Sequence, residues 1–355
     1  MSSRDSTTPR KAAEDRRYCR DVLPHVSRTF ALNIQLLNGV FGESVRIAYL
    51  LCRAADALED SWPSQGGGAV RARFDRFLAT LAGDESALAE ISSEAATLDG
   101  SRADLSLVAH LPRVMGAFHS LPEPYQNGVR SGVEVLASGM SRFAARAAER
   151  PHGAAYVDTE NELHEYCYVV AGCVGEMLTR LFELTHGAGN PEAAVRRLAL
   201  APTVGEALQL TNILLDWPSD VRRGRCYVPA SWLADGGISA SDLVGRDRPE
   251  VREVARRLET LARAALARVP DYLDRIPIRC VRYRLFCLLP AVWALGSLRT
   301  ARTDPEFPWG ARRPRLPRSE LWRSSLATLV SVGDPRAVRR MLRGAESAPA
   351  ALGSA

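Results

Sequence analysis

The stretch from Tyr49 to Asp60 carries residue types that could bind a metal ion. On a helix that turns by about 100° per residue, four polar side chains share one narrow stripe, and Glu59 lies at its edge. These four are Tyr49, Arg53, Asp56 and Asp60. The rest of the stretch is mainly apolar, whereas a surface helix normally has a broad polar face. The pattern therefore favours carboxylates that face an internal cavity over carboxylates that face bulk water.

Three carboxylates on one stripe repel one another and raise each other's pKa unless a cation lies among them. Oxygen ligands suit a hard cation, so we interpret Asp56, Glu59 and Asp60 as ligands of Mg²⁺. The alternative is an ordinary solvated acidic face, which is common on helices.

A second stretch repeats this pattern about 160 residues further along the chain. Its helical stripe consists of Gln209, Asn212, Asp216 and Asp220. Pro218 is expected to break or kink this helix near its end. Two such helices facing each other across one cavity could hold several Mg²⁺ ions. The ions would bridge to the diphosphate of a substrate and stabilise it as a leaving group.

An apolar helical face lies between the two acidic stretches. It is formed by Tyr166, Val170, Cys173 and Met177. Gly172 and Gly175, close by, each lower helix stability by about 1 kcal/mol relative to alanine. They either make room for a long apolar ligand or allow close helix–helix packing. A further apolar helix, residues 284–294, is expected to form either core or cavity wall.

The 355 residues allow one large or two ordinary domains, and a composition of 46% hydrophobic and 25% charged residues is typical of a globular protein. The net charge is +5, and the positive charge is nearly all arginine. Guanidinium groups suit phosphate ligands, although a GC-rich coding bias would also produce them. The basic residues are dispersed among acids and not interleaved with aromatics, so we expect no nucleic-acid partner.

The seven cysteines are odd in number and form no Cys-x-x-Cys pair, which indicates buried thiols in a reducing compartment. No run of about 18 apolar residues exists, so we expect no transmembrane segment. The N-terminus has no signal-peptide core. We therefore expect a cytoplasmic protein. The basic segment 336–343 could hold it peripherally at a membrane, or could be a solvated terminal helix.

Helical patterns dominate the chain and strand signals are nearly absent, which predicts an all-α fold. Pro24 and His25 interrupt the first helical pattern. The later helices are expected at 69–83, 86–94, 103–119, 124–148, 156–187, 191–217, 248–269, 270–275 and 278–302, followed by a C-terminal helical pair that ends near Arg343.

These motifs, in this order, resemble the squalene/phytoene synthase family of head-to-head prenyltransferases over about residues 18–300. The motifs are Ser27–Phe30, Tyr49–Asp60, Gly139–Met140, Tyr166–Gly172, and Gln209–Asp220 followed by Gly224–Pro229. Phe286 and Cys287, followed by Pro290, are similar to the squalene synthase branch of the family.

The resemblance implies a single-domain isoprenoid-synthase helical bundle around a central cavity. Residues 15–303 would form the catalytic domain, after a disordered tail of residues 1–14. Residues 304–355 would form a Pro- and Arg-rich connector and a helical tail that pack on the same domain. The implied reaction condenses two farnesyl diphosphates to presqualene diphosphate, which squalene synthases then reduce with NADPH to squalene.

The resemblance also assigns roles to individual residues. Tyr166 would take a proton in the first half-reaction, Phe286 would stabilise carbocations by its π face, and Tyr49 would complete the catalytic set. Metal ligands would be Asp56, Glu59, Asp60, Asn212, Asp216 and Asp220. Substrate contacts would be Ser27, Arg28, Phe30, Arg53, Val170, Cys173, Met177, Gln209, Asn212 and Arg225. Contacts to the NADPH phosphates would be Arg28, Arg53, Arg313 and Arg315.

Three positions depart from the family pattern. The second acidic motif usually reads Asp-Tyr-x-Glu-Asp, but residues 216–220 lack the glutamate. The residue before this motif is commonly basic in the family, and here it is Leu215. The family also has a glutamine directly after the proline that corresponds to Pro290, and here that residue is Ala291. The resemblance therefore covers the residues for ionisation more fully than the residues for the reductive half-reaction.

Three functions remain open at this point. The first is a squalene synthase that uses Mg²⁺ and NADPH on a small prenyl diphosphate. The second is a relative that stops at presqualene diphosphate or makes a phytoene-like or modified terpenoid without reduction. The third is a non-catalytic descendant that binds prenyl lipids or a partner.

Overall fold

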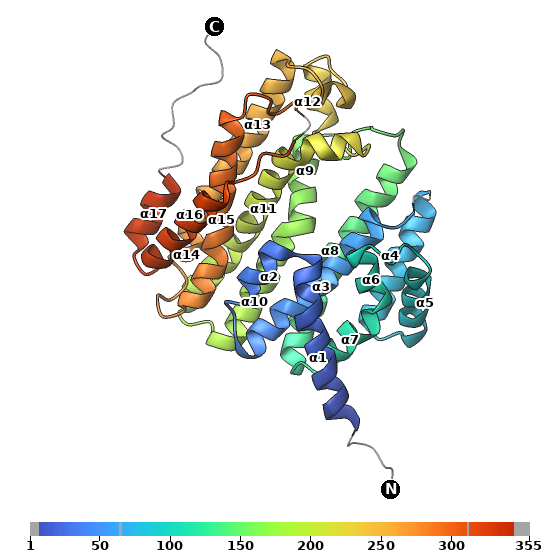
Figure 1. The fold of residues 1–355 in the computed structure, drawn as a ribbon. Coiled ribbons are helices and arrows are strands. Elements are labelled where there is room, and N and C mark those ends of the chain that lie inside the picture. The colour runs from blue at the N-terminus through green and yellow to red at the C-terminus, as the bar shows by residue number, and fades with distance from the viewer. Residues whose placement is uncertain (1–6, 64–65, 311, 344–355) are drawn as a thin grey trace. The chain divides into compact units, whose positions relative to one another are not determined.

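The computed structural model describes residues 7–63, 66–310 and 312–343 and shows an all-α protein, as predicted (Figure 1). Within these ranges no β-strand forms, and the one strand-like pairing is an isolated parallel bridge between Ala155 and Cys226. The chain divides into two compact units, Met1–Glu149 with Glu176–Gly189, and Arg150–Gly175 with Asn190–Ala355. The predicted catalytic domain, 15–303, thus comprises parts of both units, and its end at residue 303 stays a prediction.

The first unit is organised around α3, which packs against α1, α6, α7 and α8. Leucines and alanines fill the contact faces of α3, and Leu50, Leu51, Ala54 and Ala55 are completely buried. The helices of this unit are α1 (Thr7–Val26), α2 (Arg28–Ile34), α3 (Gly39–Asp60), α4 (Gly67–Ala82), α5 (Glu85–Ala96), α6 (Ala103–Ala109), α7 (Leu111–His119), α8 (Glu123–Glu149) and most of α10 (Cys173–His186).

The second unit is organised around the long helix α11 (Pro191–Arg222), which packs against α9, α13, α14, α15 and the short helix η1. Asn190 caps α11 by accepting a hydrogen bond from the Glu192 N–H at 2.8 Å, and Pro191 has the fixed φ that suits a first helical residue. The other helices are α9 (Glu160–Cys167), η1 (Tyr168–Gly172), α12 (Ala230–Asp235), η2 (Ala240–Leu243), α13 (Pro249–Leu266), α14 (Val269–Leu273), α15 (Val281–Thr303), α16 (Arg318–Ser331) and α17 (Pro335–Arg343).

Two prolines that were expected to interrupt helices lie inside them instead. Helix α1 starts at Thr7, before the expected start at Asp15, and continues through Pro24. Helix α11 continues through Pro218 to Arg222, so the predicted break is wrong. Each proline removes a single N–H donor near a helix end, where few further backbone bonds depend on it.

Two other expected helices are divided. The pattern over 103–119 forms α6 and α7, which meet at His110. The pattern over 156–187 begins at Glu160 and contains the π-helical turn η1, because α9 continues into η1 and then α10 without a loop. Such π-turns are frequent at functional sites.

Two described helices, α11 and α15, are long and apolar enough to cross a membrane by length and composition alone. The expectation that no segment of the chain crosses a membrane stays a prediction. Both helices pack against other helices of the second unit, as core helices do. Their apolar windows are 39% and 61% buried, so they are weak evidence for a membrane span.

The seven cysteines are free thiols, and five of them are buried, in agreement with the expected buried thiols.

A buried arginine joins α14, α15 and the end of α16. Arg284 is only 1% exposed. Its guanidinium donates to the carbonyl oxygens of Val332 at 3.0 Å and Ile276 at 2.9 Å, and to that of Leu273. Hydrogen bonds from a charged donor are stronger than neutral ones, so this side chain holds the C-terminal helices on α15.

We predict that Arg284→Met lowers the free energy of unfolding by about 2–4 kcal/mol, because three carbonyls lose their donor. Urea denaturation followed by circular dichroism measures the change. Arg299→Met, on the exposed side of the same helix, should change it by less than about 0.5 kcal/mol. Equal effects of the two substitutions would contradict the anchoring role.

Candidate active site

The predicted acidic stripe is the accessible line of helix α3. Arg53, Asp56 and Glu59 are half-buried and Asp60 is exposed, whereas the residues between them are buried. The other helices of the first unit cover the remaining faces of α3. The fold therefore presents these polar groups along a single line, as their spacing predicts.

Arg53 is held between two carboxylates. Its guanidinium lies 3.5 Å from Asp56 Oδ2 and 3.7 Å from Asp104 Oδ2. Asp104 is 6% exposed and also accepts hydrogen bonds from Ser61 and Arg102. Although burial opposes it, these donors hold the pKa of Asp104 below its ordinary value. Asp104 thus positions Arg53, a role that sequence reasoning missed because Asp104 lies in the first turn of α6, where an acid is common.

The Asp56 carboxylate has a strongly altered acidity. Burial raises its pKa from 3.8 to about 6, Arg53 partly opposes the shift, and Asp60 adds to it. Even so, 38% of the side chain is accessible to solvent. A carboxylate that is surrounded by protein yet reachable from outside is typical of a binding site.

Three other predicted residues meet beside this stripe. The Ser27 hydroxyl accepts a hydrogen bond from the Phe30 N–H at 3.3 Å and so caps α2. The rings of Phe30 and Tyr49 lie 5.6 Å apart. Burial raises the pKa of Tyr49, and a hydrogen bond with Ser27 partly offsets this. The side chain of Arg28 lies outside the described part of the structure.

The second acidic stripe lies in the C-terminal part of α11, residues 207–220, where the other side chains are mostly buried. Asn212 is exposed and Gln209, Asp216 and Asp220 are half-buried, while Ile213, Leu214, Leu215 and Trp217 are buried. The two stretches that the sequence singles out therefore have the same exposure pattern, each within its own unit.

Asp216 is paired with an arginine from the connector after α15. Arg313 Nη1 lies 2.8 Å from Asp216 Oδ1. Burial raises the pKa of Asp216, and Arg313, Arg223 and Arg315 oppose the rise. The two predicted cofactor contacts, Arg313 and Arg315, thus act on the second acidic stripe. Arg313 supplies a positive charge that position 215 lacks.

The departures from the family motif have visible structural consequences. The Ser219 hydroxyl, at the position of the missing glutamate, donates to the Asp216 carbonyl at 2.8 Å. The buried Trp217 donates its indole N–H to the Leu243 carbonyl at 3.1 Å. The Ser219 hydroxyl is therefore used in a hydrogen bond within α11, and Trp217 connects α11 to η2.

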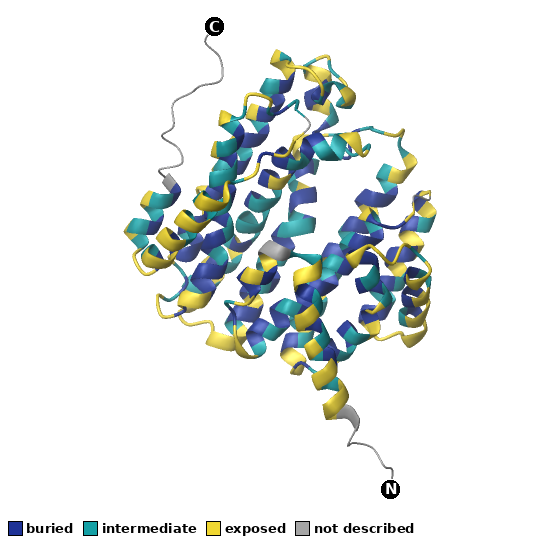
Figure 2. Ribbon diagram, in the orientation of Figure 1, coloured by how far each residue is buried: buried dark blue, intermediate teal, exposed yellow. Residues whose placement is uncertain are grey.

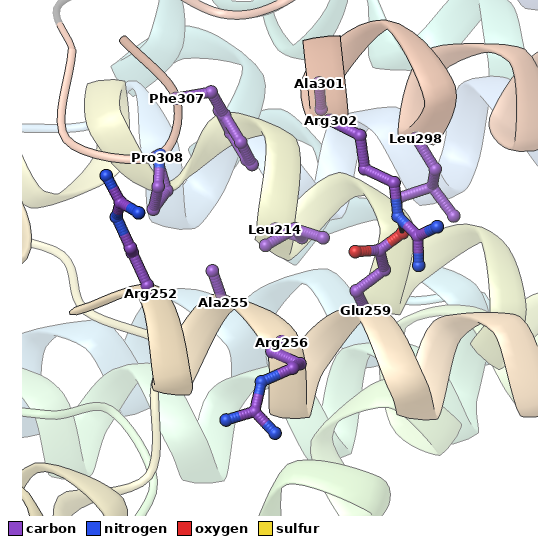
Figure 3. A pocket seen from close by; sticks show the side chains of 10 residues that line it. All are labelled: Leu214, Arg252, Ala255, Arg256, Glu259, Leu298, Ala301, Arg302, Phe307 and Pro308. Atoms are coloured by element: carbon purple, nitrogen blue, oxygen red, sulfur yellow. Dashed lines mark ion pairs between the residues drawn. The ribbon is translucent and has the colours of Figure 1, made fainter. Parts of the chain in front are cut away.

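The connector lies against α11 and α13. Phe307 and Pro308 lie beside Leu214 and Ala255 at a cavity of about 20 Å³, and Arg302 pairs with Glu259 at 2.6 Å (Figure 3). These contacts hold the connector in place a few residues before Arg313. Arg313 can therefore reach Asp216 although it lies in a segment without regular secondary structure.

Tyr166 belongs to a cluster of three tyrosines. Its ring stacks on Tyr227 with centroids 5.1 Å apart and meets Tyr156 edge-on at 5.7 Å. Tyr156 N–H donates to the Cys226 carbonyl at 2.6 Å, beside the Ala155–Cys226 bridge. No local sequence pattern places Tyr156 here, because this pairing joins segments about 70 residues apart.

Gly224 lies in the turn that precedes Tyr227 in the chain. Its φ of +77° is a conformation that only glycine adopts easily, and its Cα lies against the His152 ring. The Arg225 N–H then donates to the Asp220 carbonyl at 2.9 Å. Arg225 is half-buried here, directly after the second acidic stripe.

The glycines near η1 allow close helix packing, which was one of the two alternatives. A Cβ on Gly175 would lie 2.3 Å from the Ala201 carbonyl oxygen, and one on Gly205 would lie 2.1 Å from that of Ala171. Two backbones therefore approach each other directly. Cys173 is buried and donates its thiol to the Val169 carbonyl, whereas Val170 is half-buried.

Met177 and Phe286 are both buried. Met177 is 2% exposed and lies against Gly132 of α8 in the first unit. Phe286 is 7% exposed and stacks on Tyr283 at 6.1 Å, and Tyr283 shares a hydrogen bond with Tyr272 at 2.7 Å. Their roles in binding substrate and cations stay predictions.

The acidic stripes fit Mg²⁺ that is shared with a phosphate group. Among the described residues, no group of three or more His, Cys, Asp or Glu side chains is placed to hold a metal by itself. Mg²⁺ usually takes one or two carboxylates together with substrate phosphates and waters. Asp56, with its raised pKa and accessible oxygens, provides such a partial ligand set.

The family model described as squalene/phytoene synthase matches residues 23–320. The chain belongs to the squalene/phytoene synthase family, whose members are prenyltransferase-type enzymes.

Named relatives agree with this family. A squalene synthase of Candida albicans is 27% identical over 303 residues, which cover 84% of this chain and 64% of the relative. A probable squalene synthase of Neurospora crassa is 31% identical over 248 residues, which cover 70% of this chain and 48% of the relative. The chain thus spans less than two thirds of the length of either relative.

Solved structures share the fold. A structure of the protein TcSQS with a bound ligand has a TM-score of 0.77, is 24% identical, and aligns over 94% of this chain and 90% of its own. A dehydrosqualene synthase with ligand has a TM-score of 0.60, is 19% identical, and aligns over 92% and 97%.

We predict that Asp56→Asn stabilises the metal-free protein at pH 7.5. The folded-state pKa of about 6 exceeds the ordinary 3.8, so the ionised group opposes folding above pH 6, and this penalty vanishes as the pH falls towards 4. The melting temperature should therefore rise at pH 7.5 and change little near pH 4.

Asp104→Asn provides the control of opposite sign. Its lowered pKa means that the ionised carboxylate favours folding at neutral pH and that this contribution is lost on acidification. Asp104→Asn should lower the melting temperature at pH 7.5. If Asp56→Asn lowered it as well, Asp56 would be a structural group.

We predict that Gly175→Ala lowers the free energy of unfolding by about 1–3 kcal/mol, because the added methyl group overlaps the Ala201 carbonyl. Gly68→Ala, in α4, is the control, since nothing lies within 4 Å of its added Cβ. Chemical denaturation compares the two. A neutral Gly175→Ala would favour the alternative that this glycine makes room for a ligand.

Proposed function

We propose that the protein is a squalene synthase. It would condense two farnesyl diphosphates head-to-head to presqualene diphosphate and reduce this intermediate with NADPH to squalene. The observation that carries the proposal is the recurrence of one arrangement in both units. Each has a helical segment, 49–60 of α3 and 207–220 of α11, that is mostly buried except for a line of polar and acidic side chains, and each line has an arginine paired with one of its aspartates.

Ionisation of the first farnesyl diphosphate requires stabilisation of the departing diphosphate, and bound Mg²⁺ would supply it. Asp56, Glu59 and Asp60 would hold the metal on α3, and Asn212, Asp216 and Asp220 would hold it on α11. Arg53 would bind a diphosphate oxygen, because Asp104 fixes the guanidinium beside the stripe.

Tyr166 would take up the proton that is lost when the two prenyl chains join. The stacked ring of Tyr227 and the edge-on ring of Tyr156 limit how far the Tyr166 ring can move. Phe286 would face developing positive charge with its π system. A carbocation is quenched by water, so the reaction needs a dry pocket, and the buried apolar side chains beside these residues suit that need.

For the reductive step, Arg313 and Arg315 would contact the NADPH phosphates. Arg313 lies against Asp216, with 42% of its side chain exposed, and Arg315 is exposed. Accessible guanidinium groups suit phosphate oxygens. The expected cytoplasmic location stays a prediction.

The second candidate is a family member that stops at presqualene diphosphate or makes another terpenoid without reduction. Three observations favour it. Leu215 and Ala291 are buried apolar residues at positions that are commonly polar in the family, and Ser219 bonds to its own helix.

The test is product analysis by mass spectrometry after incubation with farnesyl diphosphate and Mg²⁺, with and without NADPH. We expect presqualene diphosphate without NADPH and squalene with it. Identical products under both conditions would support the second candidate. No conversion of farnesyl diphosphate at all would refute both.

Asp56→Asn should lower kcat at least about 100-fold, because the substitution removes a carboxylate that would help to hold the metal, and the metal stabilises the charge that develops on the leaving diphosphate. Asp99→Asn, an exposed aspartate on the surface of the same unit, should leave kcat unchanged. If Asp56→Asn retained full ligand binding and cellular function, the role would be the non-catalytic one.

A further inference from the structure

The outward face of α16 is apolar. Trp322 is 75% exposed, Leu326 65%, Leu329 56% and Val330 80%. At about 100° per residue these four side chains share a stripe about 100° wide. Figure 2 shows that much of α16 is exposed, and of its side chains only Thr328 is fully buried.

The inward face of α16 carries mainly serine and threonine, with the half-buried Leu321 among them, which reverses the usual arrangement. The Ser325 hydroxyl accepts a hydrogen bond from the Trp293 indole of α15 at 3.1 Å, and Thr328 Oγ1 donates to the Ser324 carbonyl at 2.7 Å. A cavity of about 300 Å³ also lies among α15, α16 and α17. A helix of a globular protein normally turns its apolar stripe towards the core, so the four outward side chains call for another partner.

Arginines border the apolar stripe. Arg318 and Arg323 fall on its two edges, and both are exposed. Helix α17, which packs against α16, adds the exposed Arg336 and Arg340. Arg339 pairs with Asp271 and Asp274, and two of the exposed arginines have a carboxylate neighbour, Arg323 with Glu320 at 3.3 Å and Arg340 with Asp334 at 3.9 Å. Glu320 of α16 and Asp334, directly before α17, are fewer than the four exposed arginines, so the surface keeps a net positive charge.

The size of the stripe argues against a second copy of the chain as its partner. A helix of 14 residues is about 21 Å long, and a stripe about 10 Å wide on it covers about 200 Å². A stable protein interface needs about 800 Å² on each side. A lipid bilayer has no such requirement, because a few inserted side chains and surface charges act together.

We propose that α16 docks on the surface of a bilayer that contains anionic lipids. Trp322, Leu326, Leu329 and Val330 insert between the headgroups, where tryptophan is favoured at the boundary between apolar and aqueous regions. The bordering arginines contact lipid phosphates and extend their apolar stems along the inserted side chains. This inference rests on the surface of α16 and not on the proposed reaction.

The test is co-sedimentation of the full chain with vesicles, either phosphatidylcholine alone or phosphatidylcholine mixed with phosphatidylglycerol. We expect binding to the mixed vesicles that weakens as salt is added, and much weaker binding to the neutral ones. The double variant Leu326→Ser/Val330→Ser should bind the mixed vesicles at least about tenfold more weakly. Its melting temperature should match that of the wild type, because both side chains are exposed.

Val195→Ser is the matched control, since Val195 of α11 is 69% exposed but lies in another part of the same unit. It should bind vesicles as the wild type does. The proposal would be overturned if the wild type ignored anionic vesicles, or if Val195→Ser weakened binding as much as the double variant. It would also be overturned if sedimentation velocity showed a dimer that the double variant abolishes, since a second copy would then cover the stripe.

Discussion

The placement of carboxylates on helical segments that are otherwise mostly buried is the constraint on which the rest of the structure depends. On α3 and on the C-terminal part of α11, residues 207–220, apolar packing leaves one accessible line, and aspartates lie on it. Burial raises the pKa of both Asp56 and Asp216. Stability alone would favour amides or apolar residues at these positions, so a bound cation gives the most direct reason for keeping the charge.

In each unit an arginine pairs with an aspartate of the acidic stripe, but the arginine comes from a different part of the structure. On α3 the arginine comes from the preceding turn, and the buried Asp104 holds it from the other side. On α11 the arginine comes from the connector, which Phe307 and Pro308 fix against α11 and α13. The two units thus place an arginine beside an aspartate through different local structures. The paired charges, and not a particular local structure, are the feature that both units share.

Much of this arrangement follows from local sequence patterns. Helical periodicity predicts most elements, and the spacing of Asp56 and Asp60, or of Asn212, Asp216 and Asp220, predicts the stripes, because both depend only on the geometry of one helix. Prolines misled the prediction at Pro24 and Pro218, where each helix continues for a few residues. At α11, buried neighbours such as Leu215 and Trp217 hold the flanking turns.

What the sequence did not reveal depends on contacts between distant segments. Asp104 reaches Ser61 and Arg53 only after α6 has packed on α3, and Tyr156 reaches Tyr166 only through the Ala155–Cys226 bridge. The outward stripe of α16 has the periodicity of an ordinary core-facing helix. Only the structure shows that this stripe is exposed, because the serine face of α16 is the one that contacts α15.

The proposed function requires that the two acidic stripes serve one metal–diphosphate assembly. A double-mutant cycle with Asp56→Asn and Asp216→Asn tests it most directly, with Mg²⁺-dependent binding of inorganic diphosphate measured by calorimetry. If both stripes act on the same ligand, the two losses should be non-additive by more than about 1 kcal/mol. Losses that add to within about 0.5 kcal/mol, or no loss from either substitution, would contradict the account.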